Sequence, residues 1–187
     1  MREIATFYFI GQLLMNVLMG VNMQDQDIIN KMVDLGAKYT PNKEYAAYVD
    51  FSKKSDQPRF FLVNLHDKTI EYRGYTSHGV NSGNLLQAVR FSNVWGSKKS
   101  SLGLMVTDDT YYGRHGYSLR LIGMDKGIND NVRARDIVLH PAYYVSSEYV
   151  KIHHFPGRSW GCITLDPAVS EDIINKLKEG SLLYVGD

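Results

Sequence analysis

The only cysteine of the chain lies in the stretch Gly157-Arg158-Ser159-Trp160-Gly161-Cys162-Ile163-Thr164-Leu165. Small and polar residues precede the thiol, and an apolar, β-branched run follows it. This pattern predicts a loop that delivers Cys162 to the start of a strand. Gly161 lets the backbone approach a bound carbonyl group closely, and successive amides at such a turn can point at a developing oxyanion.

Three roles are open to Cys162, because a single thiol cannot form an intrachain disulfide. It can be a small buried hydrophobe, a partner in an intermolecular disulfide or a nucleophile. Residues 137–140 read as a strand that ends on His140, and twenty-one residues separate this histidine from Cys162. An imidazole can take the thiol proton or stabilise the thiolate, which is the reactive species. We therefore treat His140 and Cys162 as a candidate catalytic pair.

The composition is that of one globular domain. A chain of 187 residues is long enough to bury a core without disulfide support. Lys and Arg number 21 against 20 Asp and Glu, so the chain lacks the broad basic face expected of a protein that binds nucleic acid. Thirteen tyrosines and two tryptophans, with many Gly and Ser, favour a β-rich domain with long loops and aromatic-lined surfaces. Such surfaces suit sugars and peptides, although aromatic residues also fill cores.

Residues 1–23 are mainly apolar, with Arg2 and Glu3 near their start. The segment is too short and too interrupted for a membrane span, which needs about 20 mainly apolar residues. Two interpretations remain, an export signal with a weak positive end and an N-terminal apolar helix packed on the domain. Residues 24–187 are expected to form a single domain.

The apolar pattern predicts more strands than helices. Alternating or β-branched runs predict strands at 45–51, 59–65, 70–76, 102–107, 117–122, 137–140 and 182–185, the last of which is expected to close the sheet. A loop is expected at 108–116, and a long irregular segment at 79–101. Long loops without secondary structure inside a compact domain are usually functional.

A helical period predicts two clear helices, at 25–38 and 167–178. Asp166 can cap the second helix, Pro167 suits its first turn, and Gly180 can stop it. A third, short helix is expected at 142–150.

The loop around the cysteine resembles the L,D-transpeptidase catalytic domain of the YkuD superfamily, whose motif is a histidine, a spacer and then Ser/Thr-x-Gly-Cys. The matching residues are His140 and Ser159-Trp160-Gly161-Cys162, and the better match is the branch with Trp before the Gly-Cys pair. Other motifs of that branch have counterparts at Ser77-His78-Gly79-Val80-Asn81-Ser82-Gly83, Phe91-Ser92-Asn93, Ser100-Ser101-Leu102-Gly103, Tyr111-Tyr112-Gly113-Arg114-His115-Gly116-Tyr117-Ser118-Leu119-Arg120-Leu121 and Asn129-Asp130-Asn131. The resemblance covers residues 45–187. It implies a mainly β (α+β) fold, a mixed β-sheet sandwich with a few peripheral helices.

The resemblance also implies a reaction. The Cys162 thiolate would attack the carbonyl of the third residue of a peptidoglycan tetrapeptide stem and expel the terminal D-alanine. His140 would act as acid and base, oriented by the backbone carbonyl of Pro141, where the family usually has glycine. The amides of Gly161 and Cys162 are the expected oxyanion hole. An amine of a neighbouring stem would then form a 3→3 crosslink, whereas water would make the protein an L,D-carboxypeptidase.

Four residues near the motifs are expected to contact substrate or to support the site. The family motif places His78 and Gly79 near the cleft. Ser159 is expected to support the cysteine loop by hydrogen bonding, and Trp160 to form a wall of the site.

Two arginines, Arg120 and Arg158, are candidates for holding a substrate carboxylate by a bidentate contact. Many relatives carry an arginine shortly after the cysteine, a region where this chain has Thr164. That contact is therefore expected to be absent or supplied by another residue.

Other classes of protein agree less well with the sequence. A sortase-like transpeptidase would need an arginine after its cysteine, and no arginine follows Arg158. In the other common class of cell-wall cysteine peptidase the cysteine precedes the catalytic histidine, whereas every histidine here precedes Cys162. A non-catalytic wall-binding module remains as the alternative from a different class, and it would not need the thiol.

No metal and no cofactor is expected. His153 and His154 are adjacent, which points the two rings apart on a strand, and no carboxylate lies at a usual ligand spacing from them. The expected partners are peptidoglycan stem peptides, together with carbapenems as covalent inhibitors. The resemblance further implies an exported bacterial protein of the cell envelope or periplasm, with membrane contact only through residues 1–23 if they are retained.

Overall fold

The computed structural model describes residues 23–187. The predicted export signal or apolar helix at 1–23 lies outside the described residues, apart from Met23, which begins helix α2. The elements in chain order are α2 (Met23–Tyr39), β1 (Tyr45–Asp50), β2 (Phe60–Asn64), β3 (Thr69–Gly74), β4 (Gly103–Gly113), β5 (Gly116–Gly123), β6 (Val138–Pro141), the 3-10 helix η1 (Tyr143–Val145), α3 (Ser147–His153), β7 (Ile163–Leu165), α4 (Pro167–Leu177) and β8 (Leu182–Gly186).

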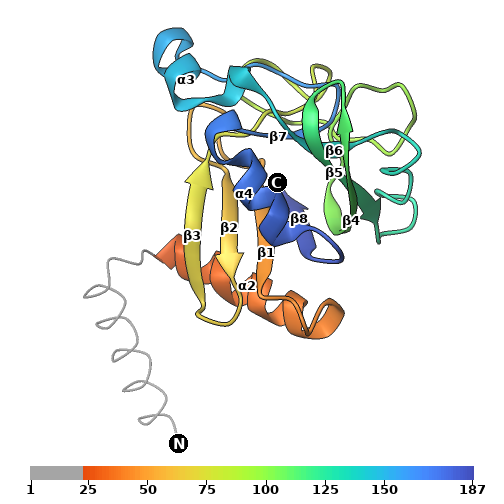
Figure 1. Ribbon diagram of the computed structural model, residues 1–187. Coiled ribbons are helices and arrows are strands. Elements are labelled where there is room, and N and C mark those ends of the chain that lie inside the picture. The colour runs from red at the N-terminus through yellow and green to blue at the C-terminus, as the bar shows by residue number, and fades with distance from the viewer. Residues whose placement is uncertain (1–22) are drawn as a thin grey trace, which may run out of the picture.

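The strands of the described residues form one mixed sheet in the order β3-β2-β1-β8-β4-β5-β6-β7 (Figure 1). β8 runs parallel to β1 and β7 runs parallel to β6, whereas the other neighbours are antiparallel. The strand predicted at 182–185 is present, but as β8 it lies in the middle of the sheet and does not close it. It joins the meander β1–β3 to the strands that carry the cysteine and histidine.

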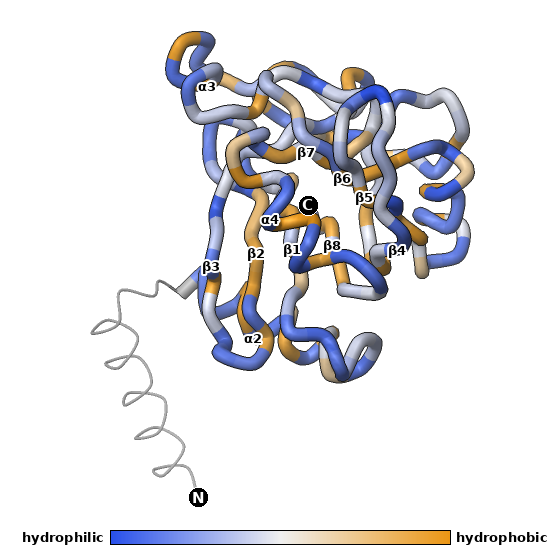
Figure 2. The backbone as a smooth tube through the Cα atoms, viewed as in Figure 1, coloured by the Kyte–Doolittle hydropathy of each residue, from blue (hydrophilic) through white to orange (hydrophobic). Residues whose placement is uncertain are grey.

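Apolar side chains are buried on both faces of the central strands. Helix α4 packs on one face, where Ile173 and Ile174 share a core cluster with Leu183 of β8. Helix α2 packs on the other face, where Met32 shares a second cluster with Leu182. Because both faces are covered, β8 needs apolar residues at consecutive positions. In Figure 2 the colour of the tube marks hydrophobic residues in β2 and β8, near the middle of the molecule.

Both clear helices are confirmed. The helix predicted at 167–178 is α4, in which the Asp166 side chain accepts a hydrogen bond from the amide of Ala168 at 3.0 Å and Pro167 occupies the first turn. The helix predicted at 25–38 is α2.

The remaining segments complete a mainly β, α+β fold, which confirms the predicted class. The short helix expected at 142–150 is divided into η1 and α3, which ends at His153. The segment 79–101 contains no helix or named strand, as its Gly, Ser and Asn content predicts.

The loop predicted at 108–116 is wrong. β4 and β5 form a hairpin that leaves only Arg114 and His115 between them. The signal for a loop was the polar pair at 108–109, which the strand accommodates as an irregularity in its pairing with β5. The longer hairpin brings its tip close to β6.

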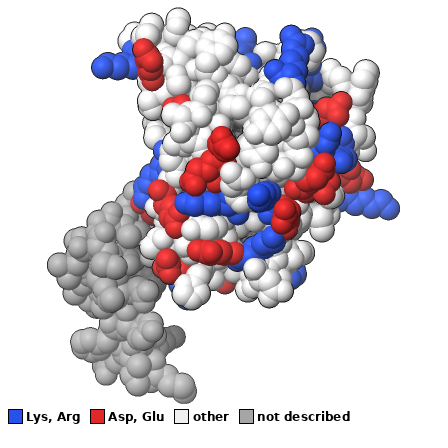
Figure 3. All heavy atoms as spheres, in the orientation of Figure 1, with Lys and Arg blue, Asp and Glu red and all other residues white. Residues whose placement is uncertain are grey.

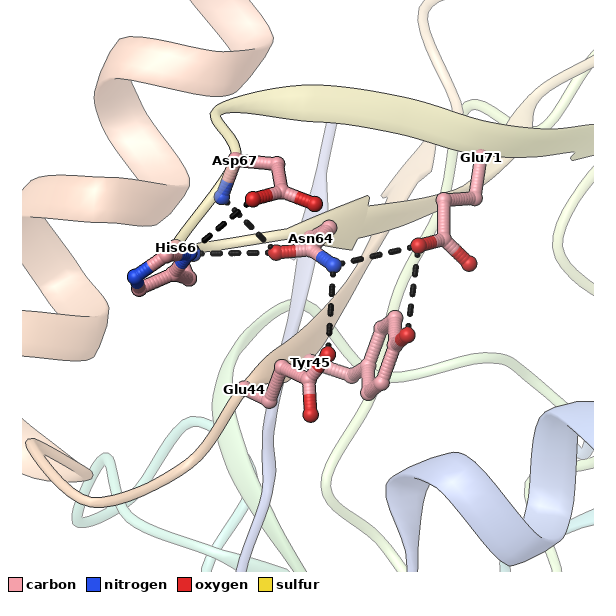
Figure 4. A network of polar contacts seen from close by, with 6 residues as sticks. All are labelled: Glu44, Tyr45, Asn64, His66, Asp67 and Glu71. Carbon is pink, nitrogen blue, oxygen red and sulfur yellow. Dashed lines mark hydrogen bonds and ion pairs between the residues drawn. The ribbon is translucent and has the colours of Figure 1, made fainter.

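Asn64 fixes the turn between β2 and β3 (Figure 4). Its side-chain oxygen accepts hydrogen bonds from the amides of His66 and Asp67 at 3.0 and 2.9 Å. Its side-chain nitrogen donates to Glu44 at 3.4 Å and to Glu71 at 3.1 Å. Because this amide is buried, its hydrogen bonds avoid the cost of an unsatisfied polar group.

Charged side chains of both signs are interspersed on the face of the molecule drawn in Figure 3. Such mixing gives that face no large field of a single sign. None of the helices within residues 23–187 has the length and apolar character needed to cross a bilayer.

Candidate active site

The pairing of β6 with β7 places His140 and Cys162 on the same side of the sheet. Leu139 pairs with Ile163, and both side chains are in the core. Successive side chains of a strand point to opposite faces, so His140 and Cys162 point away from that core. Both line one cleft of about 690 Å³, a volume within the usual range of ligand sites. A second cavity of about 570 Å³ lies beside the C-terminal end of α2, and its lining includes no thiol.

Cys162 is half-buried and lines this cleft. Its thiol donates a hydrogen bond to the carbonyl oxygen of Asp136 at 3.6 Å. Burial raises the pKa of the thiol above its ordinary value, although the amide of Val138 and the guanidinium of Arg135 partly oppose this effect. Since an ordinary cysteine already titrates at about 8.5, the thiol is protonated at neutral pH.

His140 is almost fully buried, and a carbonyl group sets its tautomer. Its Nδ1 lies 2.9 Å from the carbonyl oxygen of Pro141, which can only accept, so Nδ1 carries the proton and Nε2 keeps a lone pair. Burial lowers the pKa of His140 to about 4, so the ring is neutral at pH 7. The hydrogen bond expected from Pro141 is present, and the ring is in the state that a base requires. No hydrogen bond joins His140 to the Cys162 thiol within residues 23–187.

The cysteine loop is held by the side chain of Ser159. Its Oγ accepts a hydrogen bond from the Gly161 amide at 3.1 Å and donates to the carbonyl oxygen of Cys162 at 2.8 Å. Gly161 has a φ of +125°, a conformation that residues with a Cβ rarely adopt. Ser159 therefore supports the loop as predicted, but the Gly161 amide is already paired. The oxyanion role of this amide stays a prediction, and it would require the amide to exchange Ser159 for the substrate oxygen.

His78 and Gly79 do not line the cleft, which corrects the prediction that they contact substrate. His78 is fully buried, where Arg59 donates to its Nδ1 at 2.9 Å and its Nε2 donates to the carbonyl oxygen of Asn84 at 2.8 Å. Burial and the charge of Arg59 lower the pKa of His78 to about 4. Gly79 is also buried, and a Cβ there would lie 2.4 Å from the carbonyl oxygen of Lys98.

The segment around these two residues instead supports the cysteine loop. The Ser159 amide donates to the carbonyl oxygen of His78 at 3.0 Å, and the Val80 amide donates to the carbonyl oxygen of Ser159 at 2.8 Å. This short parallel bridge fixes the base of the loop that carries the thiol.

The structure separates the two candidate arginines. Arg158 lines the cleft, where its Nη1 donates to the carbonyl oxygens of Val80 and Gly83 at 3.1 and 3.3 Å. Arg120 lies outside the cleft lining, because its guanidinium pairs with Asp109 at 3.2 Å and stacks on Tyr111. Arg158 is therefore the only one of the pair that the structure brings to the thiol.

Sequence reasoning missed His115 as a residue of the site. It lies at the tip of the β4–β5 hairpin and stacks on His140, with ring centroids 4.3 Å apart and 23° between the planes. It also lines the cleft. In the sequence, His115 was noted only as part of the motif at 111–121, and no role was assigned to it. The ring covers one face of His140 and limits how that imidazole can turn.

Tyr144 was also missed. It lies in η1 and lines the cleft, and Gly157 packs against its ring so closely that a Cβ there would lie 2.8 Å from it. Burial, followed by the charge of an ionised Cys162, raises the pKa of the Tyr144 hydroxyl to about 12. The hydroxyl is therefore protonated at neutral pH, and it lines the same cleft as the thiol.

A protonated thiol and a neutral imidazole that share one cleft can support acyl transfer through a covalent intermediate. The family model described as the L,D-transpeptidase catalytic domain matches residues 22–185, and the chain belongs to this family.

Solved structures of L,D-transpeptidases are among those similar to the chain. The enzyme from Mycobacterium smegmatis is 11% identical with a TM-score of 0.46, over 77% of this chain and 59% of that one. An enzyme from Stackebrandtia nassauensis is 15% identical with a TM-score of 0.43, over 78% and 57%. An LD transpeptidase in complex with imipenem is 12% identical with a TM-score of 0.46, over 76% and 59%. The matches thus span less than two thirds of those chains, and no curated protein matches this one.

The two buried histidines, His78 and His140, are expected to make the folded protein less stable in acid. Each has a folded pKa of about 4, whereas an unfolded histidine titrates near 6.5. Between these values the unfolded state binds more protons, so the stabilisation present above about pH 6.5 is lost as the pH falls towards 4. We expect the free energy of unfolding to drop by on the order of 2 kcal/mol for each histidine between pH 7 and 4.5, as measured by urea denaturation.

The variant His78→Gln tests this assignment, because it removes one of the two titrations. We expect its stability to change less with pH than that of the unaltered protein. His66→Gln is the matched control, since His66 is exposed. An equal pH dependence in all three proteins would contradict the assignment.

Proposed function

We propose that the protein is a cysteine-dependent L,D-transpeptidase that acts on peptidoglycan stem tetrapeptides and forms 3→3 crosslinks. The observation that carries the proposal is the shared cleft of Cys162 and His140, in which Pro141 holds the imidazole with its Nε2 as the basic nitrogen. Membership of the L,D-transpeptidase catalytic domain family supports the same reaction.

In the first half-reaction the thiol becomes an acyl carrier. When substrate binds, the Cys162 side chain turns away from the Asp136 carbonyl, forms a hydrogen bond to Nε2 of His140 and passes its proton to this nitrogen. Catalytic hydrogen bonds often form only in the substrate complex. The sulfur adds to the carbonyl carbon of the third stem residue. The bond to the terminal D-alanine then breaks, and His140 returns the proton to the leaving amine. The product is a thioester on Cys162 and free D-alanine.

In the second half-reaction an amine of a neighbouring stem attacks the thioester. His140 takes a proton from this amine and returns it to the departing sulfur, so the thiol is restored and an amide crosslink is formed. If water attacks in place of the amine, the same residues give an L,D-carboxypeptidase, which trims the tetrapeptide to a tripeptide.

The proposed oxyanion donors are the amides of Gly161 and Cys162, of which the Gly161 amide is bonded to the Ser159 side chain before substrate binds. The Tyr144 hydroxyl, which is protonated at neutral pH and lines the same cleft, is a further candidate donor. Loss of one donor of this kind typically lowers the rate by on the order of 10²–10³.

The charges of the cleft suit an acidic peptide. Lys98, Arg114 and Arg158 line it, and Asp136 is the acidic residue among its lining. No ion pair engages Arg114 in the part of the chain that the structure describes. The carboxylates of a stem peptide can form ion pairs with these cations, which a peptide without carboxylates cannot do.

The reaction is tested by incubating the protein with purified disaccharide-tetrapeptide and analysing the products by mass spectrometry. We expect a crosslinked dimer that lacks one D-alanine, and no product from Cys162→Ala. Tripeptide alone would identify the carboxypeptidase. Absence of both products from a folded protein would contradict the proposed reaction and favour a non-catalytic wall-binding module.

We further propose that the protein is exported and acts in the cell envelope or periplasm of a bacterium, because peptidoglycan lies outside the cytoplasm. Residues 1–23 would then direct export. Fractionation of cells that express the whole chain tests this location.

Carbapenems are the proposed covalent inhibitors, since the strained lactam carbonyl offers the thiol an acyl donor. Intact-mass spectra of carbapenem-treated protein should show one adduct, and Cys162→Ala should show none. A folded protein without an adduct would argue against an active thiol but not against the fold.

A further inference from the structure

Both tryptophans of the chain are exposed at the same cleft. Trp95 is 77% exposed and Trp160 is 69% exposed, and each lines the cleft of Cys162 and His140. Tryptophan is usually buried over most of its surface, and a large exposed apolar surface in a soluble domain commonly marks a binding site. Residues 1–22 contain no tryptophan, so every indole of the protein faces this cleft.

The loop that carries Trp95 is fixed on both of its sides. The guanidinium of Arg135 donates to the hydroxyl of Ser97 at 3.1 Å and to the carbonyl oxygen of Lys99 at 2.6 Å, and it also contacts the carbonyl oxygen of Ser92. Asn93 donates to Asp130 at 2.6 Å. Binding of a ligand to Trp95 therefore costs little conformational entropy, because the loop that carries this residue is already ordered.

The backbone at Trp160 is also fixed, because this residue lies between Ser159 and Gly161, which are joined by a hydrogen bond. The ammonium group of Lys98 lies 4.3 Å from the centroid of its ring. One face of the indole thus carries a cation, and a ligand can stack on the other.

We propose that Trp95 and Trp160 form a subsite for the glycan part of the substrate, a pyranose ring of the amino-sugar disaccharide that carries the stem peptide. The proposal rests on the proposed function, which supplies a substrate that is both sugar and peptide. A pyranose ring has an apolar C–H face, which packs on an indole, and polar hydroxyl groups at its rim, which stay in water. The cations of the cleft remain for the carboxylates of the peptide.

This subsite makes the protein selective for stems attached to sugar. We expect kcat/KM to be about tenfold higher for disaccharide-tetrapeptide than for the free tetrapeptide, the size of effect that one stacked ring supplies. In Trp95→Ala this ratio should fall towards one, and Trp95→Phe should restore part of it. Val94→Ala is the matched control, because Val94 is a neighbouring exposed residue outside the cleft lining.

The outcomes separate the two proposals. An unaltered protein that processes both substrates with equal kcat/KM would overturn the glycan subsite and leave the transpeptidase intact. A ratio that persists in Trp95→Ala would also overturn it. A folded protein that processes neither substrate would count against the proposed function, and the subsite would then be decided by binding alone.

Binding is measured through the intrinsic fluorescence of the two indoles, with Cys162→Ala protein and the disaccharide without its peptide. We expect a saturable change in fluorescence. The affinity obtained from it should be lower when Trp95→Phe is added to this protein, and lower again with Trp95→Ala. No saturable change with the disaccharide, or an equal one with a nucleoside monophosphate of similar size, would overturn the proposal.

Discussion

The parallel pairing of β6 with β7 is the constraint on which the site depends. Leu139 and Ile163 pair and enter the core, so His140, which follows Leu139, and Cys162, which precedes Ile163, point to the opposite side, where both line the cleft. A slip of one residue would exchange the two faces, so that the thiol and the imidazole would point into the apolar core and their apolar neighbours towards the cleft. The core on one side of these strands therefore fixes the register that brings His140 and Cys162 together on the other.

The Cys162 thiol and the His140 imidazole are both uncharged at rest. Burial disfavours the charged forms of both groups, which leaves a protonated thiol and an imidazole with a free Nε2. The carbonyl of Pro141 needs no backbone flexibility to orient the ring, so a proline can fill this position. The ring of His115 stacks on one face of His140 and limits the rotation of that imidazole. In the proposed reaction, charge develops only when a substrate carbonyl is in place in the cleft.

Local patterns in the sequence predicted most elements and the central pair. Helix α4, with its Asp166 cap, and the loop before Cys162 follow from neighbouring residues. The middle position of β8 could not be predicted, because its parallel partner β1 lies far away in the chain. His115 and Tyr144 reach the cleft from separate elements, so no spacing signals them. The hydrogen bond between the Gly161 amide and the Ser159 side chain could not be predicted, because it depends on the conformation of the folded loop.

The central claim is that the thiol is protonated at rest and passes its proton to His140 only during the reaction. The rate of alkylation of Cys162 as a function of pH tests it most directly, because the chain has no other cysteine to react. The account predicts a thiol pKa above the ordinary value of about 8.5, with little change in His140→Asn. A thiol that titrates below about 7, and whose pKa rises in His140→Asn, would show a thiolate paired with an imidazolium and would contradict the account.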